Sequence, residues 1–213
     1  AGSLATGFVL MDLLPMRAIA QLLGAMGAVL GLLLMLGSGI PRARRVGPFI
    51  FAGALIMITP WAADRLYGNL WGRLLKDKEF VDVVENKSGV ICVDASGGVY
   101  GGGAWDGLFN VDPSREIRSP LHNIISRAYA LAVLHPHPQS VLMIGLGSGS
   151  WAQVIANHPS VKRLVVIEIN PGYVELIGRQ PEIKSLLTNP KVEIVIDDGR
   201  RWLNRHQEQF DFV

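Results

Sequence analysis

The chain has 213 residues, enough for one large domain or two small ones. A formal net charge of +2 gives no reason to expect a broad nucleic-acid-binding surface, so we expect no nucleic-acid partner. Hydrophobic residues make up 49% and charged residues 18%, an apolar balance that is unusual for a soluble enzyme. The single cysteine, Cys92, excludes an internal disulfide and a cysteine-based metal cluster.

The first third of the chain has the pattern of membrane-spanning helices. Residues 18–40 carry no charge, and a helix of this length can cross a hydrocarbon core of roughly 30 Å. A secretory signal peptide fits less well, because its apolar region would be shorter. Residues 47–63 are just long enough for a second span, and residues 4–14 are typical of the remaining end of a helix that starts outside the chain. We therefore expect residues 1–64 to hold the end of one helix and two spans in a lipid bilayer.

A linker at residues 65–78 is expected to lead into a small β domain at residues 79–118. Residues 80–85 and 89–93 are rich in β-branched side chains and are separated by a polar turn. Glycine-rich turns then punctuate a further hairpin that ends near Phe109.

The rest of the chain, residues 119–213, is predicted to alternate helices and strands. Ser119 and Pro120 have the positions of an N-cap and a first-turn proline, and His135-Pro136-His137-Pro138 ends that helix. The two histidines have no third ligand nearby in the sequence, so we expect no metal. Short apolar strands follow, as in the centre of a parallel sheet; they cover residues 140–144, 163–167 and 191–196, with the start of a fourth at 210–213.

These elements predict an α/β fold. The main part is a Rossmann-like domain of the class I methyltransferase type, incomplete at the C-terminus. A small N-terminal β domain and transmembrane helices precede it.

The ends of the predicted strands carry a candidate nucleoside site. The glycine loop Gly145-Leu146-Gly147-Ser148-Gly149 lets the backbone approach a ligand and directs helix N–H groups toward it. Glu168 follows by about twenty residues, the spacing at which a second-strand carboxylate meets ribose hydroxyls. Asp197 or Asp198 can accept from an adenine amino group. The predicted cofactor-binding residues are Gly145, Gly147, Ser148, Gly149, Glu168, Ile169, Asp197, Asp198 and Gly199.

The kind of nucleoside follows in part from the loop. A nicotinamide dinucleotide is disfavoured, because Ser150 stands where the G-x-G-x-x-G pattern has its third glycine. Several further stretches match one family: Val83-Val84-Glu85-Asn86, Asp106-Gly107, Leu121-His122-Asn123, Val141 to Gly149, Val165 to Asn170, Val195 to Gly199 and Phe210 to Val213.

On these stretches, the sequence from about residue 79 resembles the spermidine synthase (polyamine aminopropyltransferase) family. Within it, the sequence looks like a membrane-fused branch in which transmembrane helices precede the synthase-like domain. The resemblance implies aminopropyl transfer from decarboxylated S-adenosylmethionine to a polyamine-type amine. It implies that Glu168 holds the ribose, that Asp197 and Asp198 lie on the adenine side, that His122 binds the substrate, and that the catalytic acid lies beyond Val213. A homodimer is a further expectation.

Three departures from the family pattern bear on the substrate. Ser148 stands where the family usually has an aspartate that pairs with the amine of the aminopropyl group. Asn123 stands where the family's Tyr-His-Glu has its acid, although His122 is retained. The glutamine expected before the first β strand is replaced near Glu79.

Three functions therefore stay open. The first is an aminopropyltransferase. The second is a methyltransferase-like enzyme that uses intact S-adenosylmethionine, because the Ser148 hydroxyl could accommodate a carboxylate. The third is a non-catalytic nucleoside-sensing domain on a membrane transporter-like protein. Lysine and arginine counts do not orient the spans, but the expected cofactor is cytosolic, so we expect a multi-pass cell-membrane protein with a cytoplasmic soluble domain.

Overall fold

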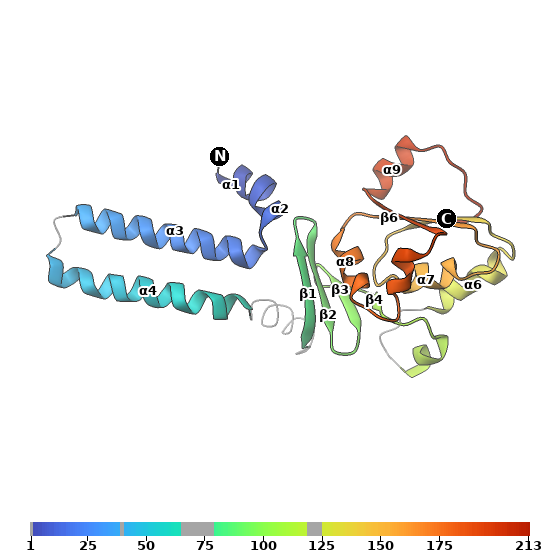
Figure 1. Cartoon of the computed structure of the whole chain (residues 1–213), viewed down its shortest axis with the longest axis horizontal. Coiled ribbons are helices and arrows are strands. Elements are labelled where there is room, and N and C mark those ends of the chain that lie inside the picture. The colour runs from blue at the N-terminus through green and yellow to red at the C-terminus, as the bar shows by residue number, and fades with distance from the viewer. Residues whose placement is uncertain (1, 39–40, 65–78, 119–124) are drawn as a thin grey trace. The chain divides into compact units, whose positions relative to one another are not determined.

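The computed structural model describes residues 2–38, 41–64, 79–118 and 125–213 (Figure 1). Contacts between Cα atoms divide the chain into two compact units. One unit is Ala1–Glu79 with Glu85–Lys87, and the other is Phe80–Val84 with Ser88–Val213. The first is helical and the second is α/β. The predicted linker at residues 65–78 lies outside the described residues.

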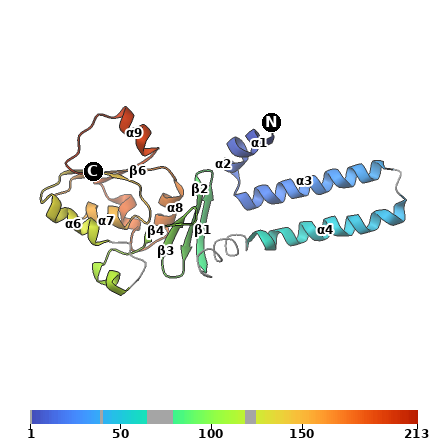
Figure 2. The same cartoon turned by 180° about the vertical axis from the view of Figure 1, so that it is seen from behind.

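The helical unit begins with one short, irregular helical stretch made of α1 (Gly2–Ala5), a π-helical turn (Thr6–Leu10) and α2 (Met11–Leu13). Pro15, in an extended conformation, separates α2 from α3 (Met16–Gly37). The helix α4 (Arg42–Asp64) continues through Pro48 and Pro60. Figures 1 and 2 show α3 and α4 side by side and antiparallel.

The helix α3 is long and apolar enough to cross a membrane over Ala18–Gly37, by length and composition. Only 6% of its most apolar stretch is buried, so its large side chains face outward. The apolar part of α4, Val46–Ala62, is shorter, and the prediction of a second span stays a prediction. The exposed side chains of α3 are Leu22, Leu23, Met26, Val29, Leu30, Leu33, Leu34 and Leu36.

A four-stranded sheet opens the α/β unit, with the order β1-β2-β3-β4. Its neighbours β2 and β3, and β3 and β4, pair antiparallel. Gly102 and Gly103 have φ angles of +56° and +84°, which explains the glycines in the turn between β3 and β4. The strands are β1 (Phe80–Asn86), β2 (Gly89–Asp94), β3 (Gly98–Gly101) and β4 (Ala104–Leu108).

A parallel sheet follows, built from β5 (Ser140–Ile144), β6 (Arg163–Glu168) and β7 (Val192–Ile196) in that order. Phe212 pairs in parallel with Val141, on the edge of β5 that β6 leaves open. The chain thus adds strands on one side of β5 and then returns to the other side. This reversal creates a topological switch point at the carboxyl end of β5, where ligands bind in open parallel sheets.

Helices connect these strands as the sequence predicts. The Asn170 side chain accepts from the Gly172 N–H at 2.9 Å at the start of α8, and the Asp198 side chain caps α9. The predicted helix start at residues 119–120 lies outside the described residues, and the described helix there is α6. The helices are η2 (Pro113–Arg118), α6 (Ser126–Leu134), α7 (Ser150–Ala156), α8 (Gly172–Gly178), η3 (Lys184–Thr188) and α9 (Gly199–Arg205).

Successive side chains of β5 and β6 point to opposite faces of the sheet, so they pack into two separate layers of the core. Val141, Leu164 and Val166 face a layer that also contains Ile91 and Val99 of the small sheet. Side chains on the opposite face of the strands pack against α9; they are Leu142, Val165 and Ile167, with Trp202. The two sheets therefore share one continuous apolar core, which fixes β4 beside the carboxyl end of β5.

Candidate functional site

The loop after β5 needs its glycines. Gly145, Gly147 and Gly149 have φ angles of +93°, +53° and +74°, a region that other residues adopt at a cost of roughly 1–2 kcal/mol. A Cβ atom on Gly149 would also lie 2.7 Å from the Cδ1 atom of Ile177 in α8. The sequence prediction of a tight loop between strand and helix is confirmed here, and its glycines have steric reasons.

The same loop is joined to β4 and to the segment that follows it. A Cβ atom on Gly147 would lie 3.2 Å from the Asp106 carbonyl oxygen, so the two backbones approach closely. The buried Ser150 hydroxyl donates to the Leu108 carbonyl at 2.8 Å and accepts from the Asn110 N–H at 3.1 Å. Ser148 is also buried, and its hydroxyl donates to the Ser150 hydroxyl at 3.1 Å. Ser150, which stands where a dinucleotide-binding loop has its third glycine, thus links the glycine loop to the small sheet by hydrogen bonds.

Glu168, the last residue of β6, lies directly against the glycine loop. Its side chain is only 4% exposed. One carboxylate oxygen accepts from the Leu146 N–H and the other from the Asn170 N–H, both at 2.7 Å. Because a carboxylate oxygen can accept more than one bond, each retains capacity for a ligand hydroxyl. The carboxylate is therefore held in place before any ligand arrives.

A second acidic group faces the loop from β4. Asp106 accepts a hydrogen bond from the Tyr173 hydroxyl of α8. Burial, the hydrogen bond to Asp106 and the negative charges of Asp106 and Glu168 raise the pKa of Tyr173 well above its ordinary value. A Cβ atom on Gly101 would collide with both members of this pair, so the glycine of β3 makes room for it. Tyr173 stays protonated and donates to Asp106 at any physiological pH.

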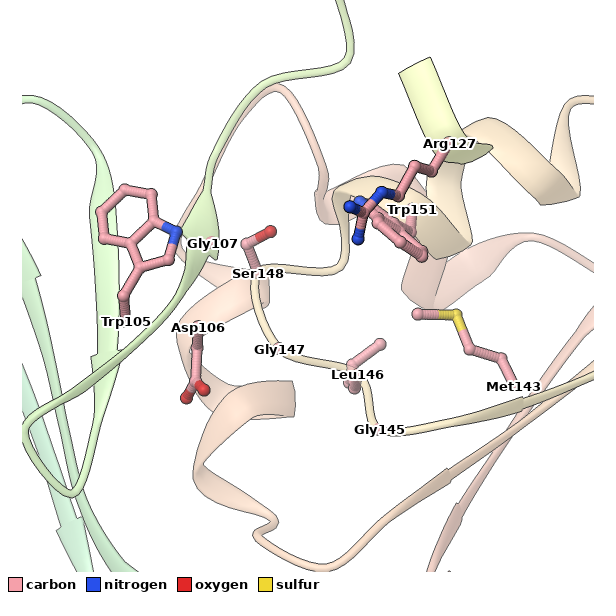
Figure 3. A pocket seen from close by; sticks show the side chains of 10 residues that line it. All are labelled: Trp105, Asp106, Gly107, Arg127, Met143, Gly145, Leu146, Gly147, Ser148 and Trp151. Atoms are coloured by element: carbon pink, nitrogen blue, oxygen red, sulfur yellow. The ribbon is translucent and has the colours of Figure 1, made fainter. Parts of the chain in front are cut away.

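The glycine loop and Asp106 border a cavity of about 370 Å³ (Figure 3). That volume lies at the lower end of the range for small-molecule sites. The glycine loop forms its floor, β4 one wall, and the helices α6 and α7 another. The lining residues are Trp105, Asp106, Gly107, Arg127, Met143, Gly145, Leu146, Gly147, Ser148 and Trp151.

The predicted site residues fall into three groups. Gly145, Gly147 and Ser148 line the cavity, and Glu168 lies behind this lining, where it accepts from the Leu146 N–H. Gly149 packs behind the loop on α8. His122 lies outside the described residues.

The remaining predicted residues follow β6 and β7, next to the cavity lining but not in it. Ile169 is 61% exposed. The Asp197 N–H donates to the Glu168 carbonyl at 3.0 Å, which joins the two strand ends. A hydrogen bond from the Arg201 side chain holds the pKa of Asp197 below its ordinary value. Asp198 accepts from the Arg201 N–H at 2.8 Å, and Gly199 begins α9. Both acids thus have partners within α9.

Sequence reasoning missed several lining residues. Trp105, Arg127 and Trp151 come from three different elements, and no spacing in the sequence connects them with the glycine loop. Asp106 was singled out only as part of a family match. Within the described ranges, no group of three or more His, Cys, Asp or Glu side chains is placed to hold a metal ion.

Comparison with known proteins identifies the kind of domain. Residues 128–213 match the family model of the spermine/spermidine synthase domain. The polyamine aminopropyltransferase of Thermoanaerobacter sp. (strain X514) is 40% identical over 80 residues, which are 37% of this chain and 29% of the relative. That of Clostridium kluyveri (strain NBRC 12016) is 38% identical over 80 residues, with the same coverage of both chains. Residues 128–213 are therefore similar to the spermine/spermidine synthase domain, and the 80 matched residues span less than a third of these relatives' length.

Solved structures agree on the fold. The spermidine synthase from Thermotoga maritima superposes with a TM-score of 0.51 and 20% identity, over 63% of this chain and 45% of that one. A spermidine synthase in complex with the transition-state analogue AdoDATO gives the same TM-score and identity, over 63% and 46%. The antiparallel sheet followed by a parallel sheet is thus the arrangement of these enzymes.

Proposed function

We propose that the α/β unit binds S-adenosylmethionine or its decarboxylated form and transfers an alkyl group from the sulfur to a polyamine-type amine. The observation that carries this proposal is the Glu168 carboxylate, buried against the glycine loop at the switch point of the sheet. The match of residues 128–213 to the spermine/spermidine synthase domain supports it, because that family uses decarboxylated S-adenosylmethionine as co-substrate.

Each predicted residue then has a role. The glycine loop brings its backbone against the ligand, and Glu168 accepts from the two ribose hydroxyls. Ile169 offers an apolar surface to one face of the adenine, and its exposure leaves that surface available. Asp198 has one oxygen engaged by α9 and one to accept from the adenine amino group, beside Asp197 and Gly199. His122 is assigned to the amine substrate from the family resemblance alone.

The reaction needs little covalent chemistry from the protein. The amine nitrogen attacks the first carbon of the donor's three-carbon chain, and the bond between that carbon and the sulfonium sulfur breaks. The bonding pair moves to sulfur, which leaves as a neutral thioether in methylthioadenosine. The amine loses one proton to a base, a role that we assign to none of the described residues. The protein contributes by holding the two reactants in line within the cavity.

We extend the proposal to the whole chain. Residues 1–64 would anchor it in the cell membrane, 65–78 would form a linker, 79–118 the small β domain and 119–213 the Rossmann-like domain. The outward-facing apolar side chains of α3 and α4 support lipid as their surroundings. This arrangement would place the protein in a membrane-fused branch of the family, with the α/β unit in the cytoplasm.

Turnover tests the proposal. The full chain in detergent is incubated with putrescine and, separately, with each form of the donor, and methylthioadenosine release is measured. We expect release that depends on both substrates and is lost in Glu168→Gln. The matched control is Glu193→Gln, an exposed glutamate of β7. Release in Glu168→Gln equal to the wild-type rate would contradict the assigned role.

A further inference from the structure

The cavity has a positive charge on one wall. Arg127, in α6, lines the cavity together with Trp151, and its guanidinium group points toward the glycine loop (Figure 3). In the part of the chain that the structure describes, no carboxylate forms an ion pair with it. An arginine directed into a cavity without a counter-charge is suited to a ligand carboxylate, which its planar group can bind through two parallel hydrogen bonds.

The glycine loop adds no negative charge to balance it. Ser148, at the tip of the loop, is neutral, and its hydroxyl is turned to Ser150. The lining carboxylate is Asp106, across the loop from Arg127 (Figure 3). Its side chain points away from Arg127 and accepts a hydrogen bond from Tyr173 (Figure 3). The Arg127 guanidinium group therefore points toward the glycine loop with no carboxylate of the described residues turned toward it (Figure 3).

We propose that this cavity binds the carboxylate of intact S-adenosylmethionine through Arg127. The inference rests on the proposed nucleoside site and specifies which donor it takes. A decarboxylated donor would bring an ammonium group alone into the cavity. Arg127 would then face a second cation with no carboxylate between them, and like charges at close range disfavour binding.

Equilibrium binding to the full chain in detergent tests the nucleoside site and the choice of donor separately. Three ligands are titrated: methylthioadenosine, S-adenosylmethionine and decarboxylated S-adenosylmethionine. Methylthioadenosine has the nucleoside and sulfur but neither charged group, so it reports on the nucleoside site alone. We expect S-adenosylmethionine to bind at least about 10-fold more tightly than the decarboxylated form.

The variant Arg127→Met removes the charge from an exposed side chain while keeping an unbranched apolar stem. It should weaken S-adenosylmethionine binding by about 10- to 100-fold, as expected for one or two charge-assisted hydrogen bonds. Methylthioadenosine affinity should stay unchanged, and Arg127→Lys should keep part of the preference. Lys184→Met, which removes an exposed charge from η3, is the matched control and should change neither affinity.

Preference for the decarboxylated donor, or equal loss of all three ligands in Arg127→Met, would overturn the inference and leave the nucleoside site intact. Absence of methylthioadenosine binding in the wild-type chain would overturn the proposed function and the inference with it.

Discussion

Replacement of Glu168 by glutamine tests how the glycine loop is held. The Glu168 carboxylate accepts from two backbone N–H groups, of Leu146 and Asn170, each at 2.7 Å. A glutamine amide offers one oxygen, and its NH₂ group would face the second N–H. One buried donor is then left without an acceptor, which costs about 1–3 kcal/mol, and the other bond loses its ionic character, which costs about 1 kcal/mol more. We expect the local opening free energy to fall by roughly 2–4 kcal/mol.

Hydrogen–deuterium exchange with mass spectrometry measures this directly. In Glu168→Gln, a peptide that contains the amide of Leu146 or Asn170 should exchange roughly 30- to 700-fold faster, because each 1.4 kcal/mol is a factor of ten. The control Glu193→Gln breaks an exposed ion pair with Arg163, worth about 0–1 kcal/mol, and should leave both peptides almost unchanged. Exchange in Glu168→Gln within a few-fold of wild type would refute the view that this carboxylate holds the loop.

Three further predictions concern the contacts around the cavity. Gly147→Ala should weaken methylthioadenosine binding, because its Cβ would press on the Asp106 carbonyl oxygen. The control Gly102→Ala has a similar φ but open space around it, so it should cost about 1–2 kcal/mol of stability and leave binding intact. Equal effects of the two variants on binding would contradict the argument. Ser150→Ala should lower the unfolding free energy by about 1–3 kcal/mol in urea titrations, because Leu108 and Asn110 lose a buried partner, whereas the exposed Ser185→Ala should change it by less than about 0.5 kcal/mol. Tyr173 should not ionise below about pH 11, so wild type and Tyr173→Phe should give the same rise in absorbance at 295 nm from about pH 9 to 11; a wild-type excess equal to one tyrosinate would show the opposite.

The sign of the Tyr173 effect on stability follows from linkage. Its raised pKa means that the folded protein holds the phenolic proton more tightly than the unfolded chain does. Tyr173 therefore makes its full contribution to stability below the ordinary tyrosine pKa of about 10. Above that pH the unfolded chain releases the proton first, and stability falls until the pH passes the folded-state pKa.

The sequence predicted the parallel sheet because its strands are short and wholly apolar. Residues 140–144, 163–167 and 191–196 were expected as strands, and β5, β6 and β7 cover almost the same residues. Such strands are buried on both faces, so their pattern does not depend on distant contacts. The loop at Gly145–Gly149 was predictable for a similar reason, since positive φ angles restrict the residue type locally.

The cavity itself was less predictable. Arg127 and Trp105 reach it from α6 and β4, and only the packing of the small sheet on the common core brings these elements together. The acids after β7 were found from the sequence, but their role was not. Asp198 is an N-cap as well as a strand-end acid, and a sequence pattern does not separate the two roles. Apolar runs have the same ambiguity in the helical unit, where α3 meets the length of a membrane span and the apolar part of α4 is shorter.

The central claim is that Glu168 and the glycine loop form a nucleoside site. Equilibrium binding of methylthioadenosine to the full chain, compared between wild type, Glu168→Gln and Glu193→Gln, tests it most directly. We predict saturable binding at one site per chain, weakened at least about 10-fold in Glu168→Gln and unchanged in Glu193→Gln. No saturable binding to the wild-type chain, or equal affinity in all three proteins, would contradict the claim.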